Sequence, residues 1–411
     1  MEKVQFDILI FGATSFVGQI LTTYMADHFG VDNKYFKWGI AGRSEGKLNQ
    51  IKNSLGNKGK SLQIILADAA DETSLTALCN QTRVVISTVG PYALYGEPLI
   101  KACAETGTDY CDLTGEVQWI KAMLDKYQAT AKASGSRIVN CCGFDSIPSD
   151  IGVYFLQQQA QKKLGKTCNN IKMRVKAIKG GASGGTVASV INIAKEGVKN
   201  PALRKQLANP YLLCPENHVF SARQYNVNKP EFDQDFNAWS APFIMAVINT
   251  RVVHRSNALA DNVYGKDFKY EEAMLTGSGF KGRLTATALA AGLGAFMLGA
   301  VIQPTRWLLE NYVLPKPGEG PTPDEQLNGY YDIRFIGKTD DGQQIKCKVT
   351  GDRDPGYGST GKMLAQAAVS LALDIKKEDR AGGFWTPASI FDQRLIQRLE
   401  KEAGLAFELI V

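Results

Sequence analysis

Residues 4–18 read VQFDILIFGATSFVG, and this stretch decides the fold of the first half of the chain. The short apolar run Ile8–Phe11 is typical of a buried strand and ends at Gly12. Small residues follow it, and an apolar, helix-compatible segment begins at Phe16. A strand, a tight turn and a helix start in this order direct backbone N–H groups and the positive end of a helix dipole at one point, which suits a phosphate group.

The spacing of this turn is Gly12-x-x-Ser15-x-x-Gly18, which differs from the G-x-G-x-x-G spacing of dinucleotide-binding turns. The turn predicts a dinucleotide site, and an ordinary strand-to-helix turn is the alternative. The residues that we expect at the pyrophosphate are Gly12, Thr14, Ser15, Phe16, Val17 and Gly18.

The composition is that of a globular protein with about two domains. Of 411 residues, 44% are hydrophobic and 21% are charged. The chain has 47 Lys and Arg against 41 Asp and Glu, and the resulting net charge of +6 fits an anionic cofactor or an acidic carrier. The positive charge is too diffuse to indicate a nucleic-acid partner.

The eight cysteines are scattered, with no C-x-x-C pair and no histidine at ligand spacing, so we expect no metal site. Several lie in apolar runs typical of core residues in a reducing compartment, and the N-terminus lacks the pattern of a secretory signal. We therefore expect a cytoplasmic protein. The histidines lie in unrelated polar surroundings, and a catalytic role is open for each of them: His28, His218 and His254.

Strand-like and helix-like segments alternate six times over about the first 145 residues, with short turns between them. This alternation predicts an α/β fold, a doubly wound parallel Rossmann sheet that binds ligands at the carboxyl ends of its strands. We predict a nucleotide-binding domain at residues 1–147, with helical sequence from about 360–411 returning to pack on it. The strands are expected at 8–11, 36–41, 62–67, 84–87, 109–113 and 136–142.

Arg43 follows the second predicted strand, at the position that distinguishes NAD from NADP. A carboxylate there would bind the ribose 2′-hydroxyl, whereas an arginine accommodates a 2′-phosphate with its bidentate fork. Ser44 offers a further hydroxyl donor. The sequence predicts NADPH in preference to NADH; the alternative is a solvated arginine at the start of the next helix.

Two further turns are expected to border the cofactor. Asp68 follows the third strand, where it would either accept from the adenine amino group or cap the next helix. After the fourth strand, small groups and free backbone lie where the cofactor crosses the sheet. These residues are Thr88, Val89, Gly90 and Pro91.

Three polar residues follow the fourth, fifth and sixth strands and are candidates for catalysis. Tyr92 is expected near the nicotinamide, where it could protonate or orient a substrate. Glu116 and Asp145 could each serve as an acid or an orienting group, and each could equally cap a helix. No further constellation of catalytic residues supports one of the three over the others.

The second half, residues 148–359, predicts an α+β substrate or dimerisation domain. Alternating strands are expected at 171–178, 329–338 and 344–351, and Asp340-Asp341-Gly342 predicts a hairpin between the last two. The glycine-rich segment 180–185 is either a substrate-facing lid or a flexible turn before a helix at 186–195. Residues 200–270 have weak periodicity and predict irregular, substrate-side structure.

Residues 284–303 contain no charge and are flanked by Lys281, Arg283 and Arg306. Their length meets the requirement of a membrane span, but Gly, Ala and Thr make the segment only modestly hydrophobic. Three interpretations remain: a helix buried in the protein or lining an apolar tunnel, a helix at a lipid surface or a homodimer contact, and a true membrane span. We expect the first.

Several long motifs resemble the saccharopine dehydrogenase-like oxidoreductases, in particular the bacterial branch that includes the trans-acting enoyl reductases. In the first half these are GATSFVG, AGRS, STVGPYALYGEPLIKACAETGTDYCDLTGE and CCGFDSIPSDIG; PKPGEGPTPDEQ, GDRDPGYGSTGKML and GGFWTPASIF follow later. The resemblance covers nearly the whole chain. Ser15 is a departure, since relatives commonly have glycine there.

The resemblance implies a Rossmann domain followed by a second α+β domain, and an NADPH-dependent reductase of an enoyl group on a lipid-like or carrier-bound acyl substrate. Because fold analogy does not choose a reaction, two alternatives stay open. One is a saccharopine-type imine or amino-acid dehydrogenase, and the other is a non-catalytic NADP-binding protein.

Overall fold

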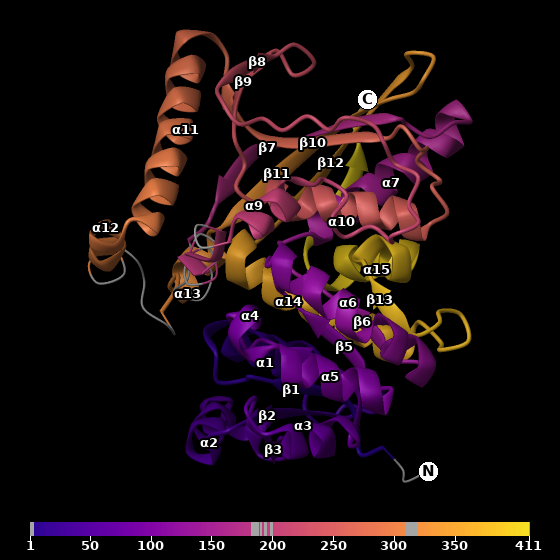
Figure 1. Ribbon diagram of the computed structural model, residues 1–411. Coiled ribbons are helices and arrows are strands. Elements are labelled where there is room, and N and C mark those ends of the chain that lie inside the picture. The colour runs from indigo at the N-terminus through magenta and orange to yellow at the C-terminus, as the bar shows by residue number, and fades with distance from the viewer. Residues whose placement is uncertain are drawn as a thin grey trace. The chain divides into compact units, whose positions relative to one another are not determined.

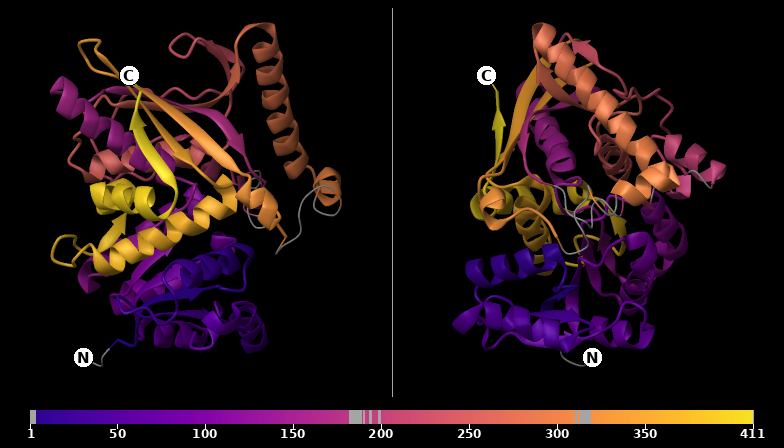
Figure 2. Two further views of the ribbon diagram at one scale, coloured as in Figure 1. Left: turned by 180° about the vertical axis from the view of Figure 1, so that it is seen from behind. Right: turned by 90° about the vertical axis from the view of Figure 1, so that its left-hand side faces the viewer.

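The computed structural model describes residues 4–181, 189, 191–192, 195–197, 200–309, 312 and 319–410. The chain divides into two compact units, which are described separately. Unit 1 takes its described residues from Met1–Phe144, Gly318–Gly320 and Gly356–Ala403, and unit 2 takes them from Asp145–Pro317, Pro321–Pro355 and Gly404–Val411. Figure 1 labels most of the helices and strands of both units, and Figure 2 gives two further views.

Unit 1 is built on a sheet of seven parallel strands in the order β13-β6-β5-β4-β1-β2-β3. The strand β1 has β2 on one side and β4 on the other, so the winding direction reverses at β1. The predicted doubly wound parallel sheet is therefore confirmed, with β13 as an added edge strand that the sequence did not predict. The bounds are β1 (Phe6–Phe11), β2 (Trp38–Gly42), β3 (Gln63–Leu66), β4 (Thr82–Ser87), β5 (Asp109–Asp112), β6 (Arg137–Val139) and β13 (Gly383–Trp385).

The helices of unit 1 begin where side chains can satisfy their first backbone N–H groups. Ser15, Ser44 and Asp71 each cap a helix by accepting a hydrogen bond from the following turn. The bounds are α1 (Phe16–His28), α2 (Glu45–Ser54), α3 (Glu72–Cys79), α4 (Tyr92–Tyr95), α5 (Glu97–Thr106), α6 (Val117–Ser134), α14 (Thr360–Leu373) and α15 (Pro387–Glu402), with a short 3-10 turn at Gly56–Gly59.

Helix α14 reaches unit 1 from far along the chain and covers part of its sheet. It packs on α1, β1, β4 and β5, and nearly all of its side chains are buried. Its many alanines allow this close approach to the sheet. The core of unit 1 is therefore made by sequence from both ends of the chain.

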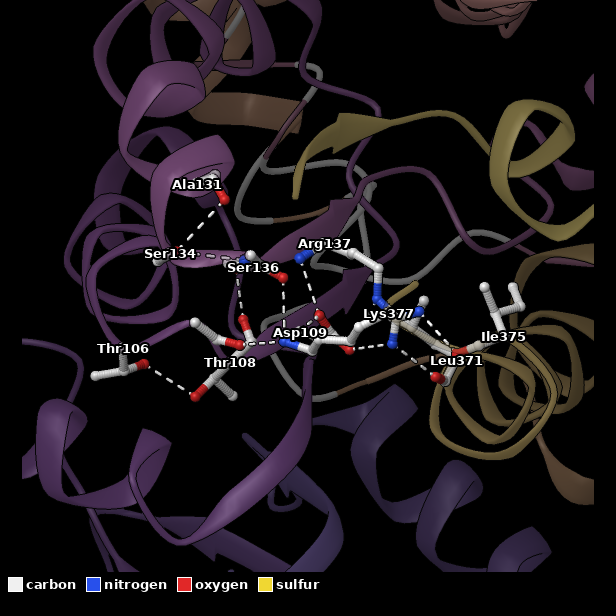
Figure 3. Close-up of polar contacts among 12 residues, drawn as sticks. Thr106, Thr108, Asp109, Ala131, Ser134, Ser136, Arg137, Leu371, Ile375 and Lys377 are labelled. Atoms are coloured by element: carbon white, nitrogen blue, oxygen red, sulfur yellow. Dashed lines mark hydrogen bonds and ion pairs between the residues drawn. The ribbon is translucent and has the colours of Figure 1, made fainter. Parts of the chain in front are cut away.

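A buried ion pair joins the two parts of unit 1, as Figure 3 shows. Arg137 donates from Nε to Asp109 Oδ2 at 3.1 Å, and its Nη2 also pairs with that oxygen. The remaining guanidinium donors contact carbonyl oxygens at the end of α14, Leu371 at 3.0 Å and Ile375 at 2.8 Å. The buried charges are stabilised because each has several hydrogen-bond partners.

Unit 2 is built on a second seven-stranded sheet, in the order β14-β12-β11-β7-β10-β9-β8. The pair β7–β10 is parallel and the other pairs are antiparallel, so the predicted mixed sheet is confirmed. The predicted hairpin joins β11 to β12, with Gly342 at a φ of +86°. The bounds are β7 (Asn170–Lys179), β8 (Glu231–Asp233), β9 (Ala238–Ala241), β10 (Lys269–Gly277), β11 (Tyr330–Lys338), β12 (Gln344–Gly351) and β14 (Leu405–Leu409).

The main helix of unit 2, α7 (Ile147–Leu164), packs on β11 and β12. Gly152 permits this contact, because a Cβ atom there would lie 2.5 Å from the ring of Phe335. The other helices are α9 (Pro201–Ala208), α10 (Ala246–Leu259), α11 (Gly279–Val301), α12 (Gln303–Leu308) and α13 (Pro323–Leu327).

The expectation of irregular structure over residues 200–270 is wrong at α10. This helix is buried on nearly all sides, and its polar residues are satisfied inside the protein: Asn249 bonds Ser146 at 3.0 Å and Glu272 at 2.9 Å. A helix with polar residues on buried faces lacks the amphipathic periodicity by which helices are recognised in a sequence, so the sequence did not predict α10. Of the helix predicted at 186–195, the structure describes residues 189, 191–192 and 195, which are helical. Most of the loop predicted at 180–185 lies outside the described residues.

The expectation of a buried helix at residues 284–303 is also wrong. The segment lies in α11, of which only Gly282, Ala286 and Ala300 are buried. Among the described residues α11 is the single helix long and apolar enough to cross a membrane, with only 11% of its most apolar window buried. Other described parts of the protein therefore leave the apolar side chains uncovered along most of this helix.

Candidate functional site

The turn after β1 lies where the winding of the unit 1 sheet reverses, between the carboxyl ends of β1 and β4. Gly12 has a φ of +87°, and a Cβ atom on it would lie 2.6 Å from Val89. A Cβ atom on Gly18 would overlap the carbonyl oxygen of Gly12. Both glycines are therefore required by close backbone approaches, as in turns that cradle a pyrophosphate.

Ser15 braces this turn through its hydroxyl group. Its Oγ accepts from the backbone N–H of Gly18 at 2.9 Å and donates to Thr88 Oγ1 at 2.9 Å. Thr88 in turn donates to the carbonyl oxygen of Gly12 at 2.8 Å. The serine that departs from the expected glycine thus ties β1 to β4 and caps α1, and it leaves the turn intact.

The amides of Phe16 and Val17 begin α1 beside this cap, where a helix dipole favours an anion. The required glycines, the capped helix start and the position at the sheet reversal all fit the pyrophosphate of a dinucleotide.

The far end of the chain contributes to this turn, which the sequence did not reveal. The ring of Phe16 contacts that of Tyr357 edge to face, with 5.1 Å between the ring centroids. A Cβ atom on Gly320 would overlap the Phe16 ring. The motifs containing Gly320 and Tyr357 resembled the family, but no local pattern connected them to residue 16.

Arg43 lies just after β2 and is exposed, so its guanidinium is accessible to a phosphate. Ser44 caps α2 by accepting from Lys47 N at 3.4 Å. Asp68 accepts from Ala70 N at 3.0 Å and so stabilises its own turn. Contacts of these three residues with a cofactor stay predictions.

Tyr92 and Glu116 lie together at the carboxyl ends of β4 and β5. The Tyr92 hydroxyl donates to the carbonyl oxygen of Ser87 at 2.9 Å, and the residue is buried. Glu116 is fully buried and accepts the backbone N–H groups of Tyr92 and Ala93, each at 2.9 Å. Glu116 therefore fixes the start of α4 and with it the position of Tyr92.

Asp112, which the sequence did not single out, organises the neighbouring turns. Its Oδ1 accepts from Thr114 N at 3.1 Å and Cys141 N at 3.0 Å, and its Oδ2 accepts from Asn140 Nδ2 at 2.7 Å. Burial raises the pKa of Asp112 to about 6 despite these hydrogen bonds. Its position as the last residue of a strand gave no signal, because an acidic residue there resembles an ordinary turn.

The other candidates belong to other elements of the two units. Asp145 is half-buried and belongs to unit 2, before α7. His28 pairs with Glu402 at 2.8 Å, and His218 Nδ1 accepts from Phe220 N at 3.2 Å. His254 is buried on α10, and burial lowers its pKa to about 3. Each histidine therefore takes part in the local structure of its own segment, and none of these contacts connects it to Tyr92 or Glu116.

The fold defines a class, an oxidoreductase with a Rossmann unit of the kind that binds a dinucleotide. Residues 8–139 match the family described as the saccharopine dehydrogenase NADP binding domain. NADPH is accordingly the cofactor.

Curated relatives match almost from end to end. A trans-acting enoyl reductase of Mycobacterium tuberculosis strain H37Rv is 34% identical over 408 residues, covering 96% of each chain. A second protein of that strain, provisionally named a trans-acting enoyl reductase, is 37% identical and covers 98% of this chain and 97% of its own. The trans-acting enoyl reductase of Mycobacterium leprae is 32% identical, covering 97% and 96%.

Among solved structures, apo saccharopine dehydrogenase (L-Glu forming) from Saccharomyces cerevisiae is similar with a TM-score of 0.54 and 13% identity, covering 99% of this chain and 100% of that one. This similarity concerns the fold alone. The chain belongs to the saccharopine dehydrogenase-like oxidoreductases, with trans-acting enoyl reductases among its relatives.

Proposed function

We propose that the protein is an NADPH-dependent enoyl reductase that acts on the carbon–carbon double bond of an acyl chain carried by another protein. The observation that carries this proposal is the near full-length similarity to trans-acting enoyl reductases, combined with the glycine cradle at Gly12 and Gly18. A relative that acts in trans supports a substrate attached to a separate carrier.

When bound, NADPH supplies a hydride to the β-carbon of the enoyl group, and the α-carbon then takes a proton. The turn at residues 12–18 would hold the pyrophosphate, and Arg43 would pair with the 2′-phosphate. Tyr92 is the candidate to orient the substrate or to supply the proton, because it lies at the carboxyl end of β4.

Glu116 acts through Tyr92 as a positioning residue. Both of its carboxylate oxygens are used by the first turn of α4, so its negative charge is directed at backbone amides. Asp112 does the same for the turns after β5 and β6. Two buried carboxylates thus hold the loops at this sheet edge in place.

We further propose an acyl-carrier protein as the bearer of the substrate, a role in lipid metabolism and a cytoplasmic location. The net charge of +6 suits an acidic carrier, and the eight cysteines are all buried thiols outside disulfides, which suits a reducing compartment. The exposed apolar residues 284–303 offer a contact with a lipid surface or with a second copy of the chain.

The test is NADPH oxidation by the purified protein with enoyl thioesters on a carrier protein and on a small pantetheine-like thiol. We expect oxidation and a saturated acyl product, faster with the carrier-bound substrate. Oxidation only with 2-oxo acids plus an amine would instead support the saccharopine-type alternative. NADPH binding without turnover of either the enoyl thioesters or the 2-oxo acids with an amine would support a non-catalytic protein.

A further inference from the structure

Helix α11 exposes apolar side chains around most of its circumference. Leu284 is 59% exposed, Leu289 42% and Met297 37%. At 100° per residue these three side chains project in directions about 80 to 140° apart, so they do not share one face. Only a narrow stripe of small residues, Gly282, Ala286 and Ala300, is buried. A helix that is apolar all round requires an apolar environment on several sides.

The charges that flank α11 in the sequence have one sign. Between Glu272 and Glu310 the sequence contains no acidic residue, while Lys281, Arg283 and Arg306 stand at the two ends of the apolar run. Cations flanking an apolar helix match a surface of anionic lipid headgroups.

Aromatic side chains accompany Arg306 beyond the C-terminal end of α11. Trp307 is 57% exposed and Tyr312 is 72% exposed, and their rings meet edge to face at 5.7 Å. Tryptophan and tyrosine are the residues enriched at the headgroup level of membranes. The composition of this end is therefore that of a membrane interface.

The topology of unit 2 excludes a single crossing of the bilayer. The strand β10, which precedes α11, runs parallel to β7, whereas β11, which follows, runs antiparallel to it. The end of β10 and the start of β11 therefore lie at the same end of the sheet, where Met274 pairs with Val175 and Tyr330 with Lys179. The chain leaves and returns on one side.

A crossing by α11 would need a second apolar segment of about 20 residues to bring the chain back. Residues 303–329 contain no such segment, since they include Arg306, Glu310, Lys316, Glu319, Asp324 and Glu325. Figures 1 and 2 show α11 running along the outside of unit 2, with β8, β9 and β10 near its N-terminal end.

We infer that α11 and α12 form a monotopic membrane anchor, which lies within one leaflet of an anionic bilayer and keeps both of its ends on the same side. The apolar faces of α11 enter the acyl region, and Lys281 and Arg306 meet the headgroups. Of the two contacts proposed above for residues 284–303, this inference chooses the lipid surface and not a second copy of the chain. It does not depend on the reductase reaction. An enzyme placed in this way would meet acyl chains at a membrane surface.

The first experiment is flotation of the full-length protein with phosphatidylcholine vesicles, with and without phosphatidylglycerol. The wild type should float with the anionic vesicles, and the double variant Leu284→Glu, Leu298→Glu should lose at least tenfold of the bound fraction. Both leucines are well exposed, so these changes leave the core of unit 2 intact. Val263→Glu, at a residue 53% exposed outside α11, is the matched control and should float like the wild type.

Reversing the flanking charges with Lys281→Glu and Arg306→Glu should remove the preference for phosphatidylglycerol. Absence of wild-type flotation, or unchanged flotation of the double leucine variant, overturns the anchor. A wild-type dimer that does not float, and that the leucine changes convert to a monomer, assigns α11 to a second copy of the chain instead.

A labelling experiment tests the monotopic arrangement. Because the eight native cysteines are buried, single cysteines introduced as Ser278→Cys or Gln303→Cys can be labelled selectively. In inverted membrane vesicles from expressing cells, a membrane-impermeant maleimide should reach both positions, and in right-side-out vesicles it should reach neither. Labelling of only one position in either preparation means that α11 crosses the bilayer, which overturns the inference.

Discussion

Glu116 and Tyr92 are joined through the backbone: one carboxylate oxygen of Glu116 accepts the N–H of Tyr92 at 2.9 Å, and the other accepts the N–H of Ala93 at 2.9 Å. Glu116 is fully buried, and the two amides begin α4. A carboxylate in this position satisfies two helix N–H groups that α4 itself leaves without acceptors. The site of the candidate tyrosine thus depends on a residue of the next loop.

Glu116→Gln should destabilise the protein and reduce turnover together. The amide has one acceptor oxygen, so its NH₂ group would face a backbone N–H, at a cost of about 1–3 kcal/mol. Thermal unfolding and steady-state rates measure the two effects. Glu105→Gln, the same change at an exposed position on α5, is the control and should alter neither. Unchanged stability of Glu116→Gln would contradict the positioning role.

Tyr92→Phe should lower kcat more than it raises the KM for NADPH. The change removes the hydroxyl that bonds Ser87 but keeps the ring, which packs on Trp119 with 5.3 Å between ring centroids. Loss of a proton donor costs about 10²–10⁴-fold in rate. Tyr95→Phe, on the exposed side of α4, is the matched control. If Tyr92→Phe turns over like the wild type, Tyr92 is not the donor.

Arg43→Ala should weaken NADPH binding by about 10- to 100-fold, because a charge-assisted pair with the 2′-phosphate contributes about 1.5–3 kcal/mol. Binding of NADH should change little. Fluorescence titration of both coenzymes gives the ratio, and Lys52→Ala in the last turn of α2 is the control. Equal loss of affinity for both coenzymes would mean that Arg43 does not read the 2′-phosphate.

Gly18→Ala and Gly46→Ala should have opposite effects. A methyl group at residue 18 overlaps the Gly12 carbonyl oxygen, so the turn must move, at a cost of about 1–3 kcal/mol and with loss of NADPH affinity. At residue 46, within α2, no atom lies within 4 Å of the added Cβ atom, and alanine favours the helix by up to about 1 kcal/mol. Thermal shift with and without NADPH measures both. A Gly18→Ala protein that binds NADPH normally argues against the cradle.

Glu272 should make stability fall as the pH rises. Burial raises its pKa from 4.5 to about 7, although Tyr270 and Asn249 donate to it and Arg174 opposes the shift. Between these pH values the folded protein holds a proton that the unfolded chain releases, so the free energy of unfolding decreases from about pH 4.5 to about pH 7, by on the order of 1–3 kcal/mol.

Urea unfolding at several pH values measures this slope. The glutamine of the Glu272→Gln variant does not titrate. The free energy of unfolding of this variant should therefore depend less on pH than that of the wild type, and the remaining dependence includes the contribution of Asp112. A wild type and a Glu272→Gln variant with the same slope would show that Glu272 is ionised throughout the range.

The elements of the Rossmann sheet could be predicted because each is specified locally. Apolar runs such as Ile8–Phe11 end at glycines or small residues, and helices with clear caps follow them. The strand β13 has three residues and pairs with β6 from a distant part of the sequence, so no local signal indicates it. Helix α10 was missed because Asn249 and its neighbours are polar yet buried.

The site was predictable in part for the same reason. The turn at Gly12 and Gly18 is a local pattern of a strand end, small residues and a helix start, and the structure shows this turn where it was predicted. By contrast, the contacts of Phe16 with Tyr357 and of Glu116 with Tyr92 depend on tertiary structure. The exposure of Leu284 on α11 could not be read from composition, because buried and lipid-facing helices are equally apolar.

The bonds from Arg137 to the carbonyls of Leu371 and Ile375 span 234 and 238 residues of sequence. During synthesis, a nascent chain that ends before α14 contains Asp109 and Arg137 but not the two carbonyl oxygens that accept hydrogen bonds from Arg137. The part of the sheet that α14 covers is then open to water. The core of unit 1 is therefore incomplete until α14 has been synthesised. We expect a fragment that ends at residue 147 to refold poorly, and a fusion of this fragment with residues 356–403 to fold by itself.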